Sequence, residues 1–270
     1  MTARVAFATF WPALLVVCSC GFADDAKPNN RPIIVIAHRG AHDTFPENTL
    51  ASIGRAVELG CDYVEVDVRA TKDGKLVLLH DGSVDRTTDG RGKIDELTFD
   101  EIRRLGVRPV STSDTARHKV PTFEEALAAC RGKIKVYVDH KAGEPAEIYR
   151  TIKQLGMISN VVVYGSVDQL REFKRLDPAI WIMPGHPGSP DKIRRLAAEL
   201  GPETLDGNLS GWTKDQVDAA HEAGAQVWVD NLGPSDNERG YRLALEFGVD
   251  AIQTDHPEAL LQFLRNTGRR

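Results

Sequence analysis

The chain has 270 residues, of which 41% are hydrophobic and 27% are charged, so it can build the core of one large α/β domain or of two smaller ones. Its formal net charge is −5, and no basic stretch is interleaved with aromatic residues. Because duplex binding normally leaves a basic footprint, nucleic acid is excluded as an expected partner.

The first 23 residues have the pattern of a secretory signal. Arg4 precedes a short apolar run, and small residues follow before an acidic, polar segment begins at Asp24. The apolar run is too short to span a membrane comfortably. We therefore expect residues 1–23 to be a signal peptide and residues 24–31 to be a short polar segment. Export to the periplasm or to the extracellular space follows from this prediction.

The four cysteines leave two questions open. Val17-Cys18-Ser19-Cys20 also resembles a bacterial lipoprotein box, which would anchor the chain to a membrane through a lipid on Cys20. Ordinary cleavage would leave only Cys61 and Cys130, and neither has the Cys-x-x-Cys spacing of a zinc site. Each of the two precedes a predicted strand, so they are either a disulfide or two buried free thiols.

The first predicted strand is the continuous apolar run of residues 32–37, which ends at His38-Arg39. A continuous run is typical of a strand that is buried on both faces, as in a parallel sheet. A helix follows, with Asn48 as its expected cap, Leu50 on its core face and Gly60 as its stop signal.

A β-hairpin is predicted next, because two β-rich runs flank Asp73-Gly74. With a two-residue loop, the register places Asp67 opposite His80. Strand alternation also puts Glu65 on the face of Asp67 and leaves the intervening valines for the other face. Local geometry therefore gathers two carboxylates and a histidine, which a purely structural hairpin does not need.

The remaining chain alternates between strand-like and helical segments about every 25 residues, which is typical of βα units. Six more parallel strands are expected at residues 134–139, 161–164, 180–183, 204–207, 227–230 and 251–254. Helices are expected to begin near residues 98, 122, 144, 168, 191, 213, 237 and 257. The return strand of the hairpin must be antiparallel, so eight parallel strands remain. This pattern predicts a (β/α)8 TIM barrel with one hairpin excursion, forming a single domain over residues 32–268.

In such a barrel, active sites lie at the C-terminal ends of the strands. Glu65, Asp67 and Asp139 end two of the predicted strands and offer hard oxygen ligands, which suit Mg²⁺ or Ca²⁺. Arg39 and Lys141 lie at the same end and can hold a phosphate-sized anion, Arg through a planar fork and Lys as a point charge. The sequence therefore predicts a divalent metal next to a bound anion.

At these positions the sequence resembles the glycerophosphodiester phosphodiesterase family, within the superfamily of PI-PLC-like TIM-barrel phosphodiesterases. The resemblance covers essentially all of the chain after residue 32. In the N-terminal half it is carried by Ala37-His38-Arg39-Gly40, Pro46-Glu47-Asn48-Thr49, Glu65-Val66-Asp67-Val68, Thr71-Lys72-Asp73-Gly74, Leu79-His80-Asp81, Asp85-Arg86-Thr87-Thr88-Asp89-Gly90 and Val120-Pro121-Thr122-Phe123-Glu124-Glu125-Ala126-Leu127. It is looser at Val227-Trp228-Val229-Asp230-Asn231 and at Gly248-Val249-Asp250-Ala251-Ile252-Gln253-Thr254-Asp255.

The resemblance implies metal-dependent hydrolysis of glycerophosphodiesters to glycerol 3-phosphate and an alcohol. It implies that His38 and His80 are the general acid–base pair and that Arg39 and Lys141 contact the phosphate. The family is thought to use the glycerol 2-hydroxyl of the substrate as nucleophile, through a cyclic phosphate that water then opens. Either histidine can be the acid, with the other as the base.

The resemblance also implies one bound divalent cation, with Glu65 and Asp67 among its ligands. The third ligand of the family is normally the glutamate of a Glu-x-Lys triplet, whereas this chain has Asp139-His140-Lys141. We keep Asp139 as the expected ligand, although its shorter side chain can widen the site, admit a water or change the metal preference.

Several nearby residues are assigned a structural or a supporting role. Trp228 is either a stacking surface in the substrate pocket or part of the barrel packing. Glu47 is expected to support Arg39 or the start of the helix rather than to bind metal. His140 should alternate away from Asp139. A supporting role is open for His186 and His256, which lie near strand ends.

Two other functions compete with the leading one. A lysophospholipase D or phospholipase C-like enzyme would keep the site but act on a lipid, and it would need an apolar entry surface. The loop over residues 108–119 is too short and too polar to indicate one. A non-catalytic barrel that binds a phosphate ligand would be favoured by the loss of His38 or His80, and both are present.

Overall fold

A computed structural model describes residues 31–111 and 114–270. The predicted signal peptide at residues 1–23, the possible lipid site at Cys20 and most of the polar segment at residues 24–31 lie outside the described residues. Among the helices of the described part, none combines the length and the apolarity that a membrane span requires.

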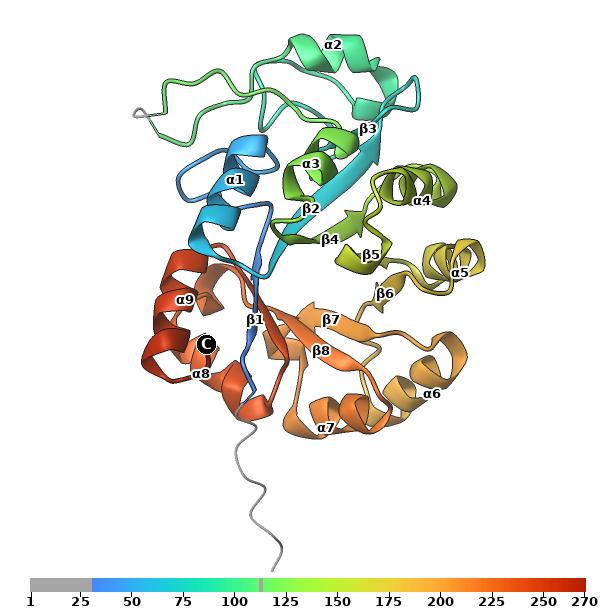
Figure 1. Cartoon of the computed structure of the whole chain (residues 1–270), viewed down its shortest axis with the longest axis vertical. Coiled ribbons are helices and arrows are strands. Elements are labelled where there is room, and N and C mark those ends of the chain that lie inside the picture. The colour runs from blue at the N-terminus through green and yellow to red at the C-terminus, as the bar shows by residue number, and fades with distance from the viewer. Residues whose placement is uncertain (1–30, 112–113) are drawn as a thin grey trace, which may run out of the picture.

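The described residues form a barrel of eight parallel strands surrounded by helices (Figure 1). The nine strands are β1 (Ile34–Ala37), β2 (Tyr63–Ala70), β3 (Leu76–Leu78), β4 (Lys135–His140), β5 (Val161–Gly165), β6 (Trp181–Pro184), β7 (Thr204–Asn208), β8 (Gln226–Asp230) and β9 (Ala251–Thr254). Neighbouring strands follow the order β6-β5-β4-β2-β1-β9-β8-β7, and β3 pairs with β2 alone. An isolated parallel bridge between Gly185 and Asp206 joins β6 to β7, so the barrel is nearly closed. The predicted TIM barrel is confirmed.

Residues 31–111 and 114–270 form nine α-helices, most of which alternate with the strands. They are α1 (Leu50–Leu59), α2 (Phe99–Arg104), α3 (Phe123–Cys130), α4 (Pro145–Gln154), α5 (Val167–Leu176), α6 (Pro190–Leu200), α7 (Lys214–Glu222), α8 (Glu238–Phe247) and α9 (Pro257–Asn266). Thr98 and Thr122 cap α2 and α3 in capping boxes with Glu101 and Glu125, so two orphan backbone N–H groups are satisfied at each start.

Alternation along β2 separates two environments. The valines of β2 pack in the layer between the strands and the helices, as the sequence predicts. Tyr63 faces the barrel interior and packs there with Tyr137 and Trp228. Because side chains two residues apart share a face, Glu65 and Asp67 point to the interior as well.

The β2–β3 hairpin differs from the prediction by one residue in register. Val68 pairs with Leu78 and Ala70 with Leu76, so Asp67 lies opposite Leu79 rather than His80. The loop has three central residues, ending at Gly74 with φ of 79°, which is the pattern of a tight turn followed by a bulge. The two-residue loop was therefore the wrong choice of turn for Asp-Gly.

The start of α1 also differs from the prediction. Thr49 is the N-cap, and its side chain accepts a hydrogen bond from the backbone N–H of Ser52. Asn48 instead has a positive φ of 55°, and its side chain is used elsewhere, as described below. Leu50, expected on the core face, is 44% exposed. Gly60 ends the helix in a left-handed conformation, as predicted.

The segment between β2 and α3 forms a projection at one end of the barrel, at the top of Figure 1. It has its own small hydrophobic core, which includes Val77, Ile94, Ile102 and Val120. The projection therefore has enough buried apolar surface to hold the loop after His80 in place.

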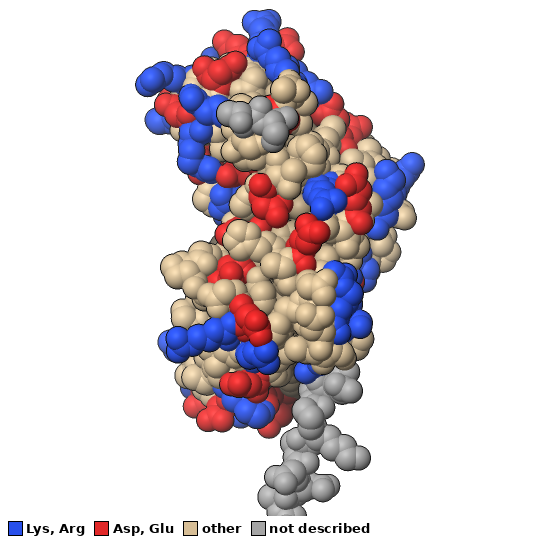
Figure 2. Space-filling view, turned by 90° about the vertical axis from the view of Figure 1, so that its left-hand side faces the viewer, with Lys and Arg blue, Asp and Glu red and all other residues tan. Residues whose placement is uncertain are grey.

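Charges of both signs are mixed on the side of the molecule where α1 and α9 lie (Figure 2). No single-sign surface extends over the projection and the barrel in this view, in keeping with the modest net charge. The two cysteines of the described chain, Cys61 and Cys130, are buried free thiols, and burial raises the pKa of each to about 12.

Gly40, directly after Arg39, provides a test of the packing beneath the strand ends. It has φ of 85°, and a Cβ at this position would overlap Ser52. We expect Gly40→Ala to lower the free energy of unfolding by about 3 kcal/mol, because it combines a left-handed backbone with overpacking. Denaturant unfolding measures the change.

Gly54→Ala is the matched control. Gly54 lies inside α1, and a Cβ there would meet no atom within 4 Å. Since alanine is the better helix former, this variant should gain about 0.5–1 kcal/mol. Equal stability of Gly40→Ala and the wild type would contradict the packing described for Gly40.

Candidate active site

Three carboxylates meet at the C-terminal ends of β2 and β4. The parallel register places Asp67 directly opposite Asp139, and Glu65 shares the face of Asp67. Ligand oxygens of the three residues all lie within 4.8 Å of one another. Glu65 and Asp67 are only 2% and 1% exposed. The structure therefore brings together the three predicted metal ligands, and neighbouring strands hold them in place.

This cluster concentrates negative charge where water cannot screen it. Burial, followed by the charges of Asp67 and Asp139, raises the pKa of Glu65 well above its ordinary value. Burial also raises the pKa of Asp139, although the ion pair with Lys141 works in the opposite direction. A divalent cation would relieve this repulsion, and the donors are all oxygen atoms. The residues fit the hard cation predicted for them, Mg²⁺ or Ca²⁺.

Two cations border the carboxylates. Nζ of Lys141 lies 2.5 Å from Oδ2 of Asp139 and 3.4 Å from Oδ1 of Asp67. Although burial lowers the pKa of Lys141, the hydrogen bond and charge of Asp139 raise it overall, so the amine is cationic. Nε of Arg39 lies 3.4 Å from Asp67 and is buried without a hydrogen-bond partner. Both predicted phosphate contacts are therefore at the cluster.

The backbone at Arg39 is held in a left-handed conformation, with φ of 50°. Its N–H donates to Oε2 of Glu65 over 2.7 Å, and its carbonyl accepts from the N–H of Asn48 over 2.9 Å. Non-glycine residues at positive φ are uncommon and are stabilised by their surroundings. Here, the strain aims the guanidinium at the carboxylates.

Asn48 is a site residue that the sequence analysis assigned to a helix cap. Its Nδ2 donates to Oδ2 of Asp67 over 2.7 Å, and its Oδ1 accepts the N–H of Asp67 over 3.1 Å. The amide thus fixes both the side chain and the backbone of Asp67. Asn48 belongs to the family motif Pro46-Glu47-Asn48-Thr49, which is a signal for a role in the site. The sequence analysis instead assigned it as a helix cap, because asparagine is a preferred residue at that position.

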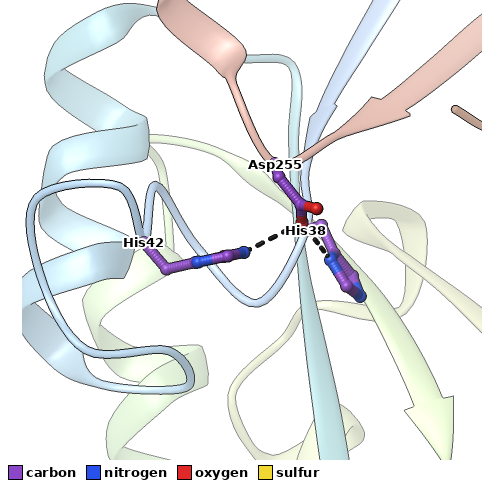
Figure 3. A group of neighbouring side chains, drawn as sticks. All are labelled: His38, His42 and Asp255. Atoms are coloured by element: carbon purple, nitrogen blue, oxygen red, sulfur yellow. Dashed lines mark hydrogen bonds and ion pairs between the residues drawn. The ribbon is translucent and has the colours of Figure 1, made fainter. Parts of the chain in front are cut away.

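His38 follows β1 and lies against Asp255, which follows β9 (Figure 3). Nδ1 of His38 is 2.6 Å from Oδ1 of Asp255. Burial alone would raise the pKa of Asp255, but hydrogen bonds from His38 and His42 hold it well below its ordinary value. An ionised carboxylate only accepts, so His38 carries its proton on Nδ1 and leaves Nε2 for proton transfer.

His80 has the same arrangement on the projection. Its Nδ1 is 2.8 Å from Oδ1 of Asp81, and its carbonyl accepts two hydrogen bonds from the guanidinium of Arg69, at 2.7 and 2.9 Å. A hydrogen bond from Arg86 holds the pKa of Asp81 well below its ordinary value. His80 lies close enough to Asp139 for its charge to lower the pKa of that carboxyl. Both predicted catalytic histidines therefore have an aspartate on Nδ1.

The guanidinium of Arg86 connects the carboxylate beside His80 with the carboxylate beside Arg39. Arg86 binds Oδ2 and Oδ1 of Asp81 at 2.7 and 3.0 Å, and it binds both oxygens of Glu47 at 2.7 and 2.8 Å. Glu47 in turn accepts from Arg39 at 3.0 Å, as its predicted supporting role requires. Arg86 thus bridges the partner of His80 and the partner of Arg39 through two planar, bidentate contacts.

The remaining sequence candidates lie outside this arrangement. Trp228 is fully buried in the barrel interior beside Tyr63, so a substrate-stacking role is not supported and its packing alternative holds. His140 is buried, pairs with the carbonyl of Gly143 and turns away from Asp139, as predicted. His186 packs on the ring of Trp212, and His256 is exposed at the start of α9.

Two further acids, Asp206 on β7 and Asp230 at the end of β8, were missing from the predicted site. Burial and the charges of Asp230 and Asp139 raise the pKa of Asp206 well above its ordinary value. One oxygen of Asp206 is buried without a hydrogen-bond partner. The signal available in the sequence was an acid inside the strand predicted at residues 204–207, where packing alone does not explain a carboxylate.

Oxygen ligands for a hard divalent ion, donors for a phosphate and two imidazoles that can move protons are the groups that phosphodiester cleavage requires. The fold and the site therefore define a TIM-barrel phosphodiesterase. Comparison with known proteins narrows this class. The model of the glycerophosphoryl diester phosphodiesterase family matches residues 38–259, and the chain belongs to this family.

Individual relatives agree with the family match. A glycerophosphodiester phosphodiesterase of Caldanaerobacter subterraneus subsp. tengcongensis is 29% identical over 87% of this chain and 99% of its own length. Human glycerophosphodiester phosphodiesterase 1 is 41% identical over 52% of this chain and 44% of its own length. A phosphodiesterase of Oleispira antarctica, solved in complex with the product sn-glycerol-3-phosphate, has a TM-score of 0.75 and 25% identity over 87% of this chain and 97% of that chain.

Arg86 provides a test of the connection between the two sides of the site. We expect Arg86→Ala to lower kcat/KM for a glycerophosphodiester by about 10- to 100-fold. This is the usual loss when a residue that holds the partners of site residues is removed, and Arg86 holds the partners of His80 and Arg39. Because the Arg86 side chain is 47% exposed, the free energy of unfolding should change by less than about 1 kcal/mol. Steady-state kinetics and denaturant unfolding measure the two effects.

Arg171→Ala is the matched control, because Arg171 also pairs with two carboxylates, Asp168 and Glu199, but on the outer helices. It should leave kcat/KM unchanged. Arg86→Lys keeps the charge without the planar fork and should fall between the wild type and Arg86→Ala. If Arg86→Ala and Arg171→Ala have the same kcat/KM, the bridge has no role in activity.

Proposed function

We propose that this protein is a metal-dependent hydrolase that converts glycerophosphodiesters to glycerol 3-phosphate and an alcohol, with His38 and His80 as its acid–base pair. The observation that carries the proposal is that each of these histidines has an aspartate on Nδ1 and therefore presents Nε2 for proton transfer. The glycerol 3-phosphate product in the related Oleispira antarctica structure supports the substrate class.

Glu65, Asp67 and Asp139 would hold one divalent cation, Mg²⁺ or Ca²⁺. When bound, such an ion supplies positive charge that offsets the phosphate and the charge that develops on its oxygens. Asp139 is one methylene shorter than the family glutamate, but its register partner is Asp67 and its carboxylate lies within the same cluster. This placement supports Asp139 as the third ligand.

The phosphate would be bound by Arg39 and Lys141. Nε of Arg39 is a desolvated donor that makes no hydrogen bond and only a 3.4 Å ion pair with Asp67, so an anionic oxygen can accept from it without breaking a hydrogen bond. Lys141 adds a point charge next to Asp67. Binding at both residues orients the phosphorus and keeps bulk water from screening the charges.

Protons would move at two atoms, Nε2 of His38 and Nε2 of His80. One imidazole removes the proton of the attacking hydroxyl, and the other donates a proton to the leaving alkoxide. Asp255 and Asp81 stabilise whichever imidazole becomes cationic, because each keeps its negative charge next to Nδ1. The two histidines can therefore exchange roles between successive steps.

The lipid-substrate alternative has less support. The large hydrophobic side chains exposed in the described part of the chain are Leu50, Val110, Trp181 and Leu243. They belong to four separate segments and do not form the continuous apolar entry that a lipid chain needs.

The test uses purified protein, stripped of metal with a chelator and incubated with glycerophosphocholine. We expect release of glycerol 3-phosphate only after Mg²⁺ or Ca²⁺ is added back. His38→Ala and His80→Ala should each lower kcat by about 10²- to 10⁴-fold, since each removes one proton-transfer group. Chromatography of the products identifies the bond that is cleaved.

His221→Ala is the control for these variants. His221 is also held by an aspartate, Asp250, but at the opposite end of the barrel, so its loss should leave turnover unchanged. Release of phosphocholine would move the scissile bond and contradict the proposed products. Metal binding without turnover of any glycerophosphodiester would favour the non-catalytic barrel.

We also propose that the protein is exported, on the basis of the signal pattern in residues 1–23. The mass of the mature chain tests this directly. A chain that begins at Asp24 indicates ordinary cleavage, and a lipid-modified chain that begins at Cys20 indicates a membrane anchor. A mature chain that retains Arg4 would contradict export by either route.

A further inference from the structure

A second cluster of metal-ligating side chains lies beside the carboxylates. Oδ1 of Asp255 is 2.6 Å from Nδ1 of His38 and 2.9 Å from Nε2 of His42 (Figure 3). The ligand atoms of the three residues all lie within 4.8 Å of one another. Two imidazole nitrogens therefore converge on a single carboxylate oxygen.

This convergence is unusual within the part of the chain that the structure describes. The other histidine–aspartate pairs found there, His80–Asp81, His118–Asp114 and His221–Asp250, each contain one imidazole. A pair with one histidine orients a ring. The second histidine at Asp255 is not needed for that purpose, because the contact with His38 is already made.

The set of two imidazoles and one carboxylate differs in chemistry from the cluster of Glu65, Asp67 and Asp139. Hard oxygen donors suit Mg²⁺ and Ca²⁺, whereas imidazole nitrogen suits Zn²⁺ and other late first-row divalent ions. The two clusters would therefore select different ions from the same solution.

The histidine cluster is accessible and firmly held. The side chains of His38, His42 and Asp255 are 14%, 25% and 25% exposed, so an ion can reach them from solvent. Asp236 accepts a hydrogen bond from the backbone N–H of Asp255 over 2.6 Å, and it also accepts one from the hydroxyl of Tyr241 over 2.8 Å. The backbone that carries the shared carboxylate is thus held in place by Asp236.

We propose that His38, His42 and Asp255 form a second metal site, which binds Zn²⁺, and that zinc bound there inhibits the enzyme. The inhibitory part of this inference rests on the proposed role of His38 in catalysis, whereas the binding part does not. To bind, each imidazole gives up the proton on the nitrogen that faces Asp255, either to its other ring nitrogen or, if the ring is cationic, to solvent.

Inhibition follows from the protonation state of His38 when zinc is bound to it. With Nδ1 bonded to the ion, the remaining ring proton of the neutral imidazole is on Nε2. That nitrogen then has no lone pair with which to accept a proton from a hydroxyl, and the ring cannot become an ordinary imidazolium. Zinc would thus stop proton transfer at His38 without displacing the cation at the carboxylate cluster.

Isothermal titration calorimetry with ZnCl₂ tests the site in the presence of saturating Mg²⁺, which keeps the carboxylate cluster filled. We expect one zinc ion to bind the wild type. His42→Ala removes one of three ligands and should weaken binding at least about tenfold. His221→Ala, which removes a histidine from a pair with one imidazole, should bind zinc as the wild type does.

The variant Glu65→Gln distinguishes zinc bound at the histidine cluster from zinc bound at the carboxylate cluster. It should keep the calorimetric zinc site, because Glu65 is not one of its ligands. Zinc binding that is lost in Glu65→Gln, or that His42→Ala leaves unchanged, would overturn the proposed site. Since calorimetry needs no turnover, these outcomes stand even if the proposed enzymatic function fails.

Activity measurements then test the inhibitory role. Zinc should lower turnover of glycerophosphocholine by the wild type at saturating Mg²⁺, and about tenfold more zinc should be needed for the same effect on His42→Ala, as its weaker binding requires. Zinc that binds through His42 but leaves turnover unchanged would overturn the inhibitory role. Inhibition of equal strength in the wild type and in His42→Ala would overturn it as well.

Discussion

The structure depends on the burial of three carboxylates at one end of a parallel barrel. Asp67 and Asp139 face each other across neighbouring strands, and Glu65 lies on the same face of β2. Charges in such a place repel strongly, because little water screens them. The surrounding groups offset this repulsion. Lys141, Arg39 and Asn48 each place a cation or a donor against the cluster, and the left-handed backbone of Arg39 is held by one of the acids.

A second layer of acids orients the two histidines that are proposed as the acid–base pair. Asp255 and Asp81 each take Nδ1 of a histidine, so both imidazoles present the same nitrogen to the site. Arg86 then connects Asp81 to Glu47, and Glu47 connects to Arg39. The projection that carries His80 has its own hydrophobic core, and this chain of ion pairs fixes it against the barrel. The orientation of His80 and the position of Arg39 are therefore linked through one guanidinium.

Sequence patterns predicted the structure correctly where it is set by neighbouring residues or by a regular repeat along the chain. Alternation separated the valines of β2 from Glu65 and Asp67, and α2 and α3 begin near residues 98 and 122, as expected. Patterns failed where two local explanations compete. Asp-Gly suits both a two-residue and a three-residue loop, and the wrong choice moved His80 by one position. Asn48 suits a helix cap, yet its amide holds Asp67 from 19 residues away.

By itself, the sequence determined the barrel, the three carboxylates, the two cations and the position of His38, because strand ends of βα units must meet at one end of the fold. The pairing of His38 with His80 came from the family resemblance. The sequence did not determine which groups hold those residues. Asp255 lies 217 residues from His38 and Arg86 lies 39 residues from Glu47, and no periodicity encodes contacts of that kind. Only the closure of the barrel and the folding of the projection bring these partners within hydrogen-bond distance. Tertiary structure therefore decided how the histidines are oriented, that Trp228 packs in the interior, and that His42 shares the oxygen of Asp255.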